Sequence, residues 1–188
     1  MAGGRDYFGV FGLERRLDVD AGELQQRYDQ RCREVHPDSG GAREEFEVLQ
    51  EAFASLQSPA RRLRHWLELA GLEGSGRGSV PAPVADRFEE ISSLLQAAET
   101  VAERHGNAQS ALVRSMAESD GMTLQGRLAE AREEVEKLSG AWVSRFGEFD
   151  RRGPTEVAEE AGEAIRALTF LEKWADQLRM AWARAGCW

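Results

Sequence analysis

The sequence is poor in cysteine and in long apolar runs, and each shortage excludes a class of protein. Only Cys32 and Cys187 occur among the 188 residues, too few for a disulfide framework or a four-cysteine metal site. No apolar run is long enough to span a bilayer, and residues 1–6 lack the apolar stretch of a secretory signal peptide. We therefore expect a cytoplasmic protein that makes no contact with a membrane.

Positive charge is also scarce relative to negative charge. The 24 basic residues are outnumbered by 33 acidic ones, which gives a formal net charge of −9. Because binding to phosphates requires a concentrated basic surface, nucleic acid is not an expected partner. No sustained alternation of apolar and polar residues occurs, so strands are not expected either. The sequence predicts an all-α protein.

The N-terminal part contains two short amphipathic helices with a distinctive tripeptide between them. The apolar residues that recur at helical spacing are Leu24, Tyr28, Cys32 and Val35 in the first, and Phe46, Leu49, Phe53 and Leu56 in the second. Asp20 is a suitable N-cap for the first helix, and Pro37 disfavours helix at His36. The pattern predicts an antiparallel hairpin with His36-Pro37-Asp38 at its tip.

Further helices flank this hairpin. Residues 5–13 predict a short helix weakened by two glycines, and Ser58-Pro59 starts a helix that ends at Gly71. Residues 73–83 are rich in Gly, Ser and Pro, which is typical of a flexible linker.

Residues 84–188 predict a three-helix bundle, because three helices with one apolar stripe each bury those stripes against one another. The first helix starts near Phe88, and the sequence leaves open whether it continues past His105. The apolar stripe of the second helix runs from Leu124 to Phe149. The third helix follows a cap at Thr155. Trp142 and Trp182 fall on these stripes and are expected in the core.

The hairpin with His36-Pro37-Asp38, preceded by Asp6-Tyr7-Phe8-Gly9-Val10-Phe11-Gly12-Leu13, resembles a J-domain. The resemblance implies an all-α fold with an N-terminal J-domain helical hairpin (1–72), a flexible linker (73–83) and a client-binding C-terminal three-helix bundle (84–188). J-domain proteins are co-chaperones that stimulate the ATPase of DnaK-type chaperones.

Among J-domain proteins, the chain is most similar to the HscB type, the co-chaperones of iron–sulfur cluster assembly. The string Leu168-Thr169-Phe170-Leu171-Glu172-Lys173-Trp174 resembles the last helix of that type, and the helix after Pro59 resembles its fourth helix. No Gly/Phe-rich region and no zinc-binding cysteine repeat follow the J-domain-like part. The first bundle helix departs from the type, because most of its acidic ladder is absent.

The resemblance implies two partners, a DnaK/HscA-type ATPase chaperone and an iron–sulfur cluster scaffold protein. For the chaperone, the candidate contact residues are His36, Pro37, Asp38, Arg27, Arg31 and Arg33. Docking is favoured for Arg27 and Arg31, which share one helix face, and the alternative is an ordinary solvated face, since Glu23–Arg27 and Asp29–Arg33 have the spacing of helical ion pairs. For the client, the candidates are Phe170, Trp174, Phe88 and Ile91. Phe170 lies one position off the core stripe, and simple core packing is its alternative role.

An enzymatic role is not expected, because a loop tip provides neither a pocket nor a nucleophile beside His36 and Asp38. No cofactor or metal is expected. Two other functions stay open: a J-domain co-chaperone for a different client, and a static helical interaction module without ATPase coupling. An ATPase assay separates the static module from the co-chaperones, and capture of a cluster scaffold separates the two clients.

Overall fold

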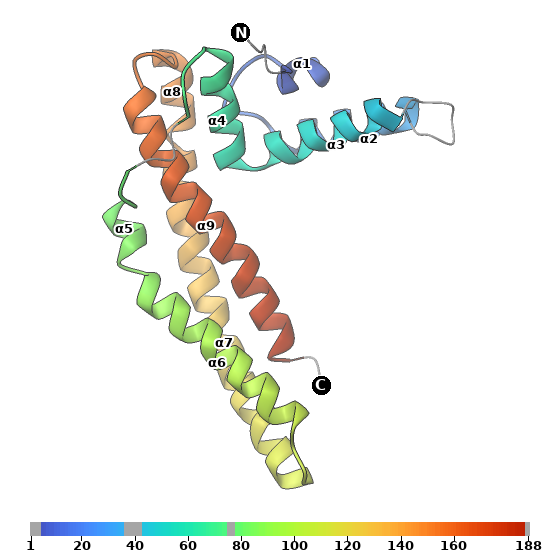
Figure 1. Cartoon of the computed structure of the whole chain (residues 1–188), viewed down its shortest axis with the longest axis vertical. Helices are drawn as coiled ribbons and strands as arrows, with labels where there is room; N and C mark the ends of the chain where they lie inside the picture. Colours follow the sequence, from blue (N-terminus) through green and yellow to red (C-terminus); the bar gives the residue numbers. More distant parts are fainter. Residues whose placement is uncertain (1–4, 36–42, 75–77, 187–188) are drawn as a thin grey trace. The chain divides into compact units, whose positions relative to one another are not determined.

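The computed structural model describes residues 5–35, 43–74 and 78–186, and it contains no strand within these ranges (Figure 1). The helices are α1 (Tyr7–Val10), α2 (Ala21–Val35), α3 (Arg43–Gln57), α4 (Pro59–Leu69), α5 (Ala82–Ala85), α6 (Phe88–Gly106), α7 (Ala111–Val143), α8 (Phe146–Arg152) and α9 (Ala158–Arg184). The predicted all-α fold, with a helical hairpin followed by long bundle helices, is confirmed.

The helix starts of the N-terminal part follow from capping side chains. Asp6 accepts hydrogen bonds from the backbone N–H groups of Phe8 and Gly9 and so begins α1. The Asp20 carboxylate accepts from the N–H of Glu23 at 2.7 Å, as expected of an N-cap. The Ser58 hydroxyl accepts from the N–H of Arg61 at 3.1 Å. The predicted start signals at Asp20 and Ser58 are therefore confirmed.

The chain forms two compact units, and neither is a single stretch of sequence. Unit 1 comprises Met1–Gly78 and Trp142–Leu168, and unit 2 comprises Ser79–Ala141 and Thr169–Trp188. This grouping differs from the predicted domains at 1–72 and 84–188. The reason is that residues 142–168 contribute apolar side chains to the same core as α1–α4. Whether residues 1–72 fold alone stays a separate prediction.

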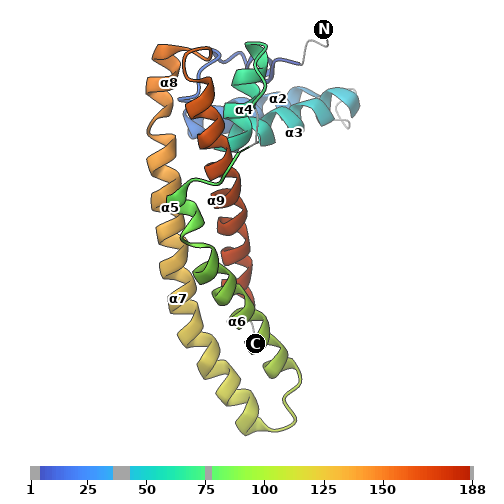
Figure 2. The ribbon, with the colours of Figure 1, turned by 60° about the vertical axis from the view of Figure 1, so that its left-hand side comes forward.

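Unit 1 has a continuous apolar core. Phe8, Leu17 and Leu56 are fully buried in it, together with Phe146 and Phe149 from α8, which are 1% and 0% exposed. Figures 1 and 2 both show α2 and α3 side by side as a hairpin. Burial of this kind of apolar surface is the main stabilising contribution to the unit.

Unit 2 is built on α6, α7 and the second half of α9. Figure 2 shows α6 and α7 side by side up to the connection that joins them at residues 107–110. Leu94, Leu124 and Leu178 are at most 6% exposed and supply one core residue from each of the three helices. The predicted three-helix packing holds in this unit.

Several details of the bundle helices were predicted wrongly. The second stripe is not one helix, because α7 ends at Val143 and α8 begins at Phe146, a break that directs Phe146 and Phe149 into the core of unit 1. α9 begins at Ala158 rather than directly after Thr155. Trp182, expected in the core, is 43% exposed.

Candidate functional site

The first candidate site is the hairpin of α2 and α3, which carries the tripeptide in the connection between the helices. His36, Pro37 and Asp38 themselves lie outside the described residues. The hairpin is closed by Tyr28, whose ring stacks on Phe53 with centroids 4.1 Å apart. Val35, the last residue of α2, is only 7% exposed. The residue before the tripeptide is therefore anchored in the core of unit 1.

The three arginines expected to dock the chaperone lie in different environments. The Arg27 guanidinium donates to the backbone oxygens of Phe11 at 2.9 Å and Gly12 at 3.1 Å, and to Glu23 at 2.6 Å. Arg31 donates to Glu34 at 2.9 Å. Arg33 is exposed. Arg27 therefore has a local structural role, whereas Arg31 and Arg33 leave more of their charge available at the surface.

The second candidate site is the seam between α6 and α9 in unit 2. Phe88 of α6 packs edge-on against Phe170 and Trp174 of α9, with ring centroids 5.1 and 4.9 Å away. Phe88 and Phe170 are half-buried. The structure thus brings together three of the four residues proposed for the client and places the aromatic ones in one cluster.

Two of these four residues are less accessible than the sequence suggested. Trp174 is 5% exposed and Ile91 is 2% exposed, so neither forms an open apolar surface. The physical reason is that Trp174 lies under the ring of Phe88, which covers it from α6. Of the four residues, Phe88 and Phe170 therefore keep the exposed surface, and Trp174 and Ile91 are part of the core.

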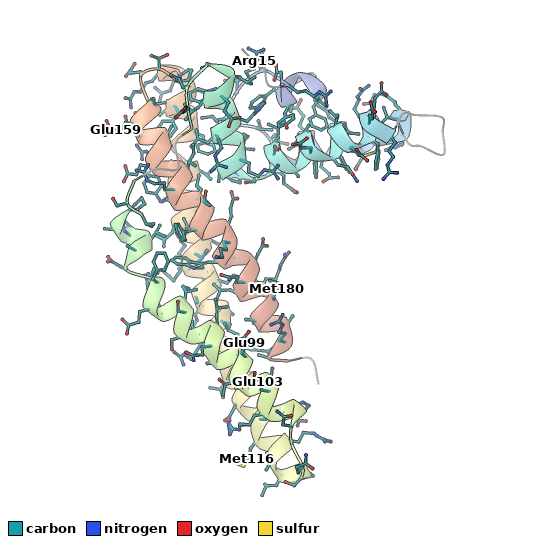
Figure 3. All side chains as sticks on the ribbon, viewed as in Figure 1. Arg15, Glu99, Glu103, Met116, Glu159 and Met180 are labelled. Carbon is teal, nitrogen blue, oxygen red and sulfur yellow. The ribbon has the colours of Figure 1, made fainter. Side chains whose placement is uncertain are left out.

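A groove of about 420 Å³ continues along the same α6–α9 seam. On α6 it is lined by Ser92, Leu95 and Glu99, which share a helix face with Phe88 because they follow it by 4, 7 and 11 residues. On α9 it is lined by Met180, which is 50% exposed. Figure 3 labels Glu99 and Met180 on the two helices.

Met180 was not among the residues singled out in the sequence. Leu95 of α6 is half-buried and also lines the groove. A signal was present, because Met180 lies off the stripe that carries Leu171 and Leu178 on α9. A large apolar residue beside such a stripe indicates an exposed apolar position.

Neither a metal-binding cluster nor a membrane-spanning helix occurs in the part of the chain that the structure describes. Within residues 5–35, 43–74 and 78–186, no group of three or more His, Cys, Asp or Glu side chains is arranged to hold a metal ion. In the same ranges, no helix has both the length and the apolar content needed to cross a bilayer.

Comparisons with known proteins agree with this geometry. No family model matches the chain. The co-chaperone protein HscB of Proteus mirabilis (strain HI4320) is 23% identical over 182 residues, which cover 92% of this chain and 93% of that protein. The structure of the chaperone HscB from Vibrio cholerae superposes with a TM-score of 0.57 at 17% identity, covering 94% of this chain and 96% of that one.

A second solved structure, the human co-chaperone protein HscB, superposes with a TM-score of 0.48 at 21% identity, covering 94% of this chain and 82% of that one. The likeness extends over nearly the full length of the bacterial proteins rather than over the hairpin alone. In sequence and in fold, the chain resembles the HscB-type co-chaperones, as its motifs predicted.

Proposed function

We propose that this protein is a cytoplasmic co-chaperone of iron–sulfur cluster assembly. It stimulates the ATPase of a DnaK/HscA-type chaperone through His36-Pro37-Asp38 and delivers a cluster scaffold protein bound to unit 2. The observation that carries the proposal is the likeness to HscB co-chaperones across 92% of the chain, which includes both candidate sites. On this proposal, the protein activates another protein's ATPase and is not itself an enzyme.

The ATPase part of the proposal is tested at the tripeptide. We expect His36→Gln and Asp38→Asn to abolish stimulation of the ATPase, measured as the steady-state rate of ATP hydrolysis. Both variants should melt within a few degrees of the wild type if the tripeptide lies at the tip of the hairpin as the sequence predicts, because surface substitutions usually change stability by less than about 0.5 kcal/mol. His105→Gln on α6 is the matched control, because it removes a histidine from the other unit.

The two alternatives make different predictions in this assay. A static interaction module does not stimulate the ATPase at all, even as the wild-type protein. A co-chaperone for a different client stimulates it but does not bind a cluster scaffold in calorimetry. If the His36→Gln protein stimulates as strongly as the wild type, the tripeptide is not the coupling element.

We further propose that the client binds the α6–α9 seam, where Phe88 and Phe170 are half-buried and Met180 is 50% exposed. Large aromatic and apolar side chains of this kind dominate many binding surfaces. We expect Phe170→Ala to weaken scaffold binding by about 2 kcal/mol. A sharply lower melting temperature with unchanged affinity would instead make Phe170 a core residue and place the client elsewhere.

Met180 offers a cleaner test of the same seam, because it is already exposed and its replacement leaves the core intact. We expect Met180→Ser to reduce scaffold affinity in calorimetric titration. Met122→Ser on α7 is the matched control: Met122 is 68% exposed but does not line the groove. Equal affinities of the two variants would contradict the proposed client surface.

A further inference from the structure

A second groove lies in unit 1, on the α1 side of the α2–α3 hairpin. Its volume is about 510 Å³, within the range of sites that hold a ligand or a few side chains. The floor is apolar and comes from three helices: Val10 of α1, Val35 of α2, and Val48 and Leu49 of α3. Val10 and Val48 are half-buried, so both keep apolar surface that a partner can cover.

The lining of this groove carries charges of both signs. Arg5 and Arg31 line it on the side of α1 and α2, and Glu44 and Glu45 line it at the start of α3. Arg31 already pairs with Glu34, an exposed contact that contributes little to stability and is easily exchanged. A lining that combines apolar, basic and acidic residues fits an extended peptide with an aliphatic side chain beside an acidic and a basic residue.

The position of the groove indicates which protein contains such a peptide. Val35 and Glu44 lie directly beside the connection that contains His36-Pro37-Asp38. A protein that engages the tripeptide therefore reaches the groove without a second binding event. Arg33 does not line the groove, so the groove adds a contact separate from that arginine.

We propose that this groove binds an extended segment of the ATPase chaperone, with one branched aliphatic residue against the valines, an acidic residue near Arg5 and Arg31, and a basic residue near Glu44 and Glu45. This inference rests on the proposed function, because the occupant is the chaperone that the tripeptide engages. On this proposal, the groove determines the affinity of the complex, and the tripeptide determines the maximal stimulated rate of ATP hydrolysis.

The test uses the full-length chain and a purified DnaK-type ATPase with ATP. The measured quantities are the co-chaperone concentration that gives half-maximal stimulation and the maximal stimulated rate. We expect Val48→Thr, which replaces a methyl group by a hydroxyl, to raise the half-maximal concentration roughly three- to tenfold and to leave the maximal rate unchanged. Thermal melting verifies that the variant is folded.

Glu44→Lys provides a second test that does not touch the core. We expect it to raise the half-maximal concentration by about tenfold. Glu47→Lys is its matched control, because Glu47 is exposed on α3 and changes the net charge equally but does not line the groove. Any effect of net charge alone appears in both variants, and an effect of the groove appears only in Glu44→Lys.

The outcomes distinguish the groove from the proposed function. If Val48→Thr and Glu44→Lys both behave as Glu47→Lys does while His36→Gln abolishes stimulation, the groove inference is wrong and the function stands. If His36→Gln stimulates as the wild type does, the proposed function fails and the groove loses its occupant.

Discussion

The guanidinium of Arg27 joins three acceptors from two segments of unit 1: two backbone oxygens in the connection after α1 and one carboxylate of α2. One of these oxygens belongs to Gly12, which has a φ of +61°, a backbone conformation that favours glycine. Arg27 therefore holds a tight turn against α2, the helix that precedes the tripeptide in the sequence.

We expect Arg27→Ala to lower the free energy of unfolding by about 1 kcal/mol, because two backbone carbonyls lose a charged donor. Arg31→Ala should change it by less than about 0.5 kcal/mol, since Arg31 pairs with an exposed glutamate, Glu34. Urea titrations of both variants measure the difference. Equal stabilities would show that the Arg27 contacts are not formed in solution.

His65 is a buried acceptor in the same unit. Its Nε2 atom accepts a hydrogen bond from the N–H of Tyr7 at 3.0 Å, its ring stacks on that of Tyr7 with centroids 4.4 Å apart, and it is 6% exposed. Burial lowers the pKa of His65, and the carboxylates of Glu68 and Asp6 oppose this only partly. A protonated imidazole can no longer accept from Tyr7.

Because the pKa of His65 is lower in the folded protein than in the unfolded chain, the unfolded chain binds more protons as the pH falls. The contribution of His65 to stability is therefore present above its ordinary pKa of about 6.5 and is lost as the pH falls toward the folded value. The His65→Gln variant keeps a hydrogen-bond acceptor but does not titrate. We therefore expect its free energy of unfolding to fall less than that of the wild type when the pH is lowered from 7.5 to 5.5.

Chemical denaturation at these two pH values measures the effect. His105→Gln is the control, and the quantity compared is the change in the free energy of unfolding of each variant relative to the wild type. Parallel pH dependences in the wild type and His65→Gln would contradict the role given to the Tyr7 contact.

At the scale of elements, α8 holds the connection between α1 and α2. The N–H of Leu17 donates to both carboxylate oxygens of Asp150, at 2.8 Å to Oδ1 and 2.9 Å to Oδ2. The N–H of Asp18 donates to Oδ2 at 3.1 Å. We expect Asp150→Ala to lower the free energy of unfolding by about 1–3 kcal/mol, because these two N–H groups lose their acceptor. Hydrogen exchange at Leu17 and Asp18 measures the local effect, and unchanged protection there would contradict it.

The elements also show what the sequence could and could not predict. Local signals sufficed for α2, α3 and α4, since Asp20, Ser58 and the apolar spacing act within a few residues. The break between α7 and α8 was not predictable locally. It depends on Phe146 and Phe149 reaching a core made by residues far away in sequence.

The candidate sites were also predictable from the sequence only in part. Phe88 and Phe170 were identified from a resemblance and do meet across α6 and α9. The burial of Trp174 was missed, because only the packing of α6 against α9 determines which ring covers which. The role of Arg27 in holding the turn was also missed, since its two backbone acceptors lie 15 and 16 residues away along the chain.

At the scale of the whole chain, the composition of unit 1 predicts how a fragment behaves. A fragment of residues 1–80 contains the hairpin but lacks Phe146, Phe149 and Leu168, which are buried in the same core. We expect this fragment to melt at a lower temperature than the full chain and to bind a hydrophobic dye. A fragment with the wild-type melting temperature would show that residues 1–72 form an independent domain.

The same composition has a consequence for synthesis on the ribosome. Residues 1–72 leave the ribosome well before residues 142–168, which complete their core. At about 5–20 residues per second, the interval between residue 72 and residue 168 lasts roughly 5–20 s. During this time the core of unit 1 lacks Phe146, Phe149 and Leu168, so part of its apolar surface stays uncovered. We therefore expect the newborn chain to depend on ribosome-associated chaperones before it acts on any other protein.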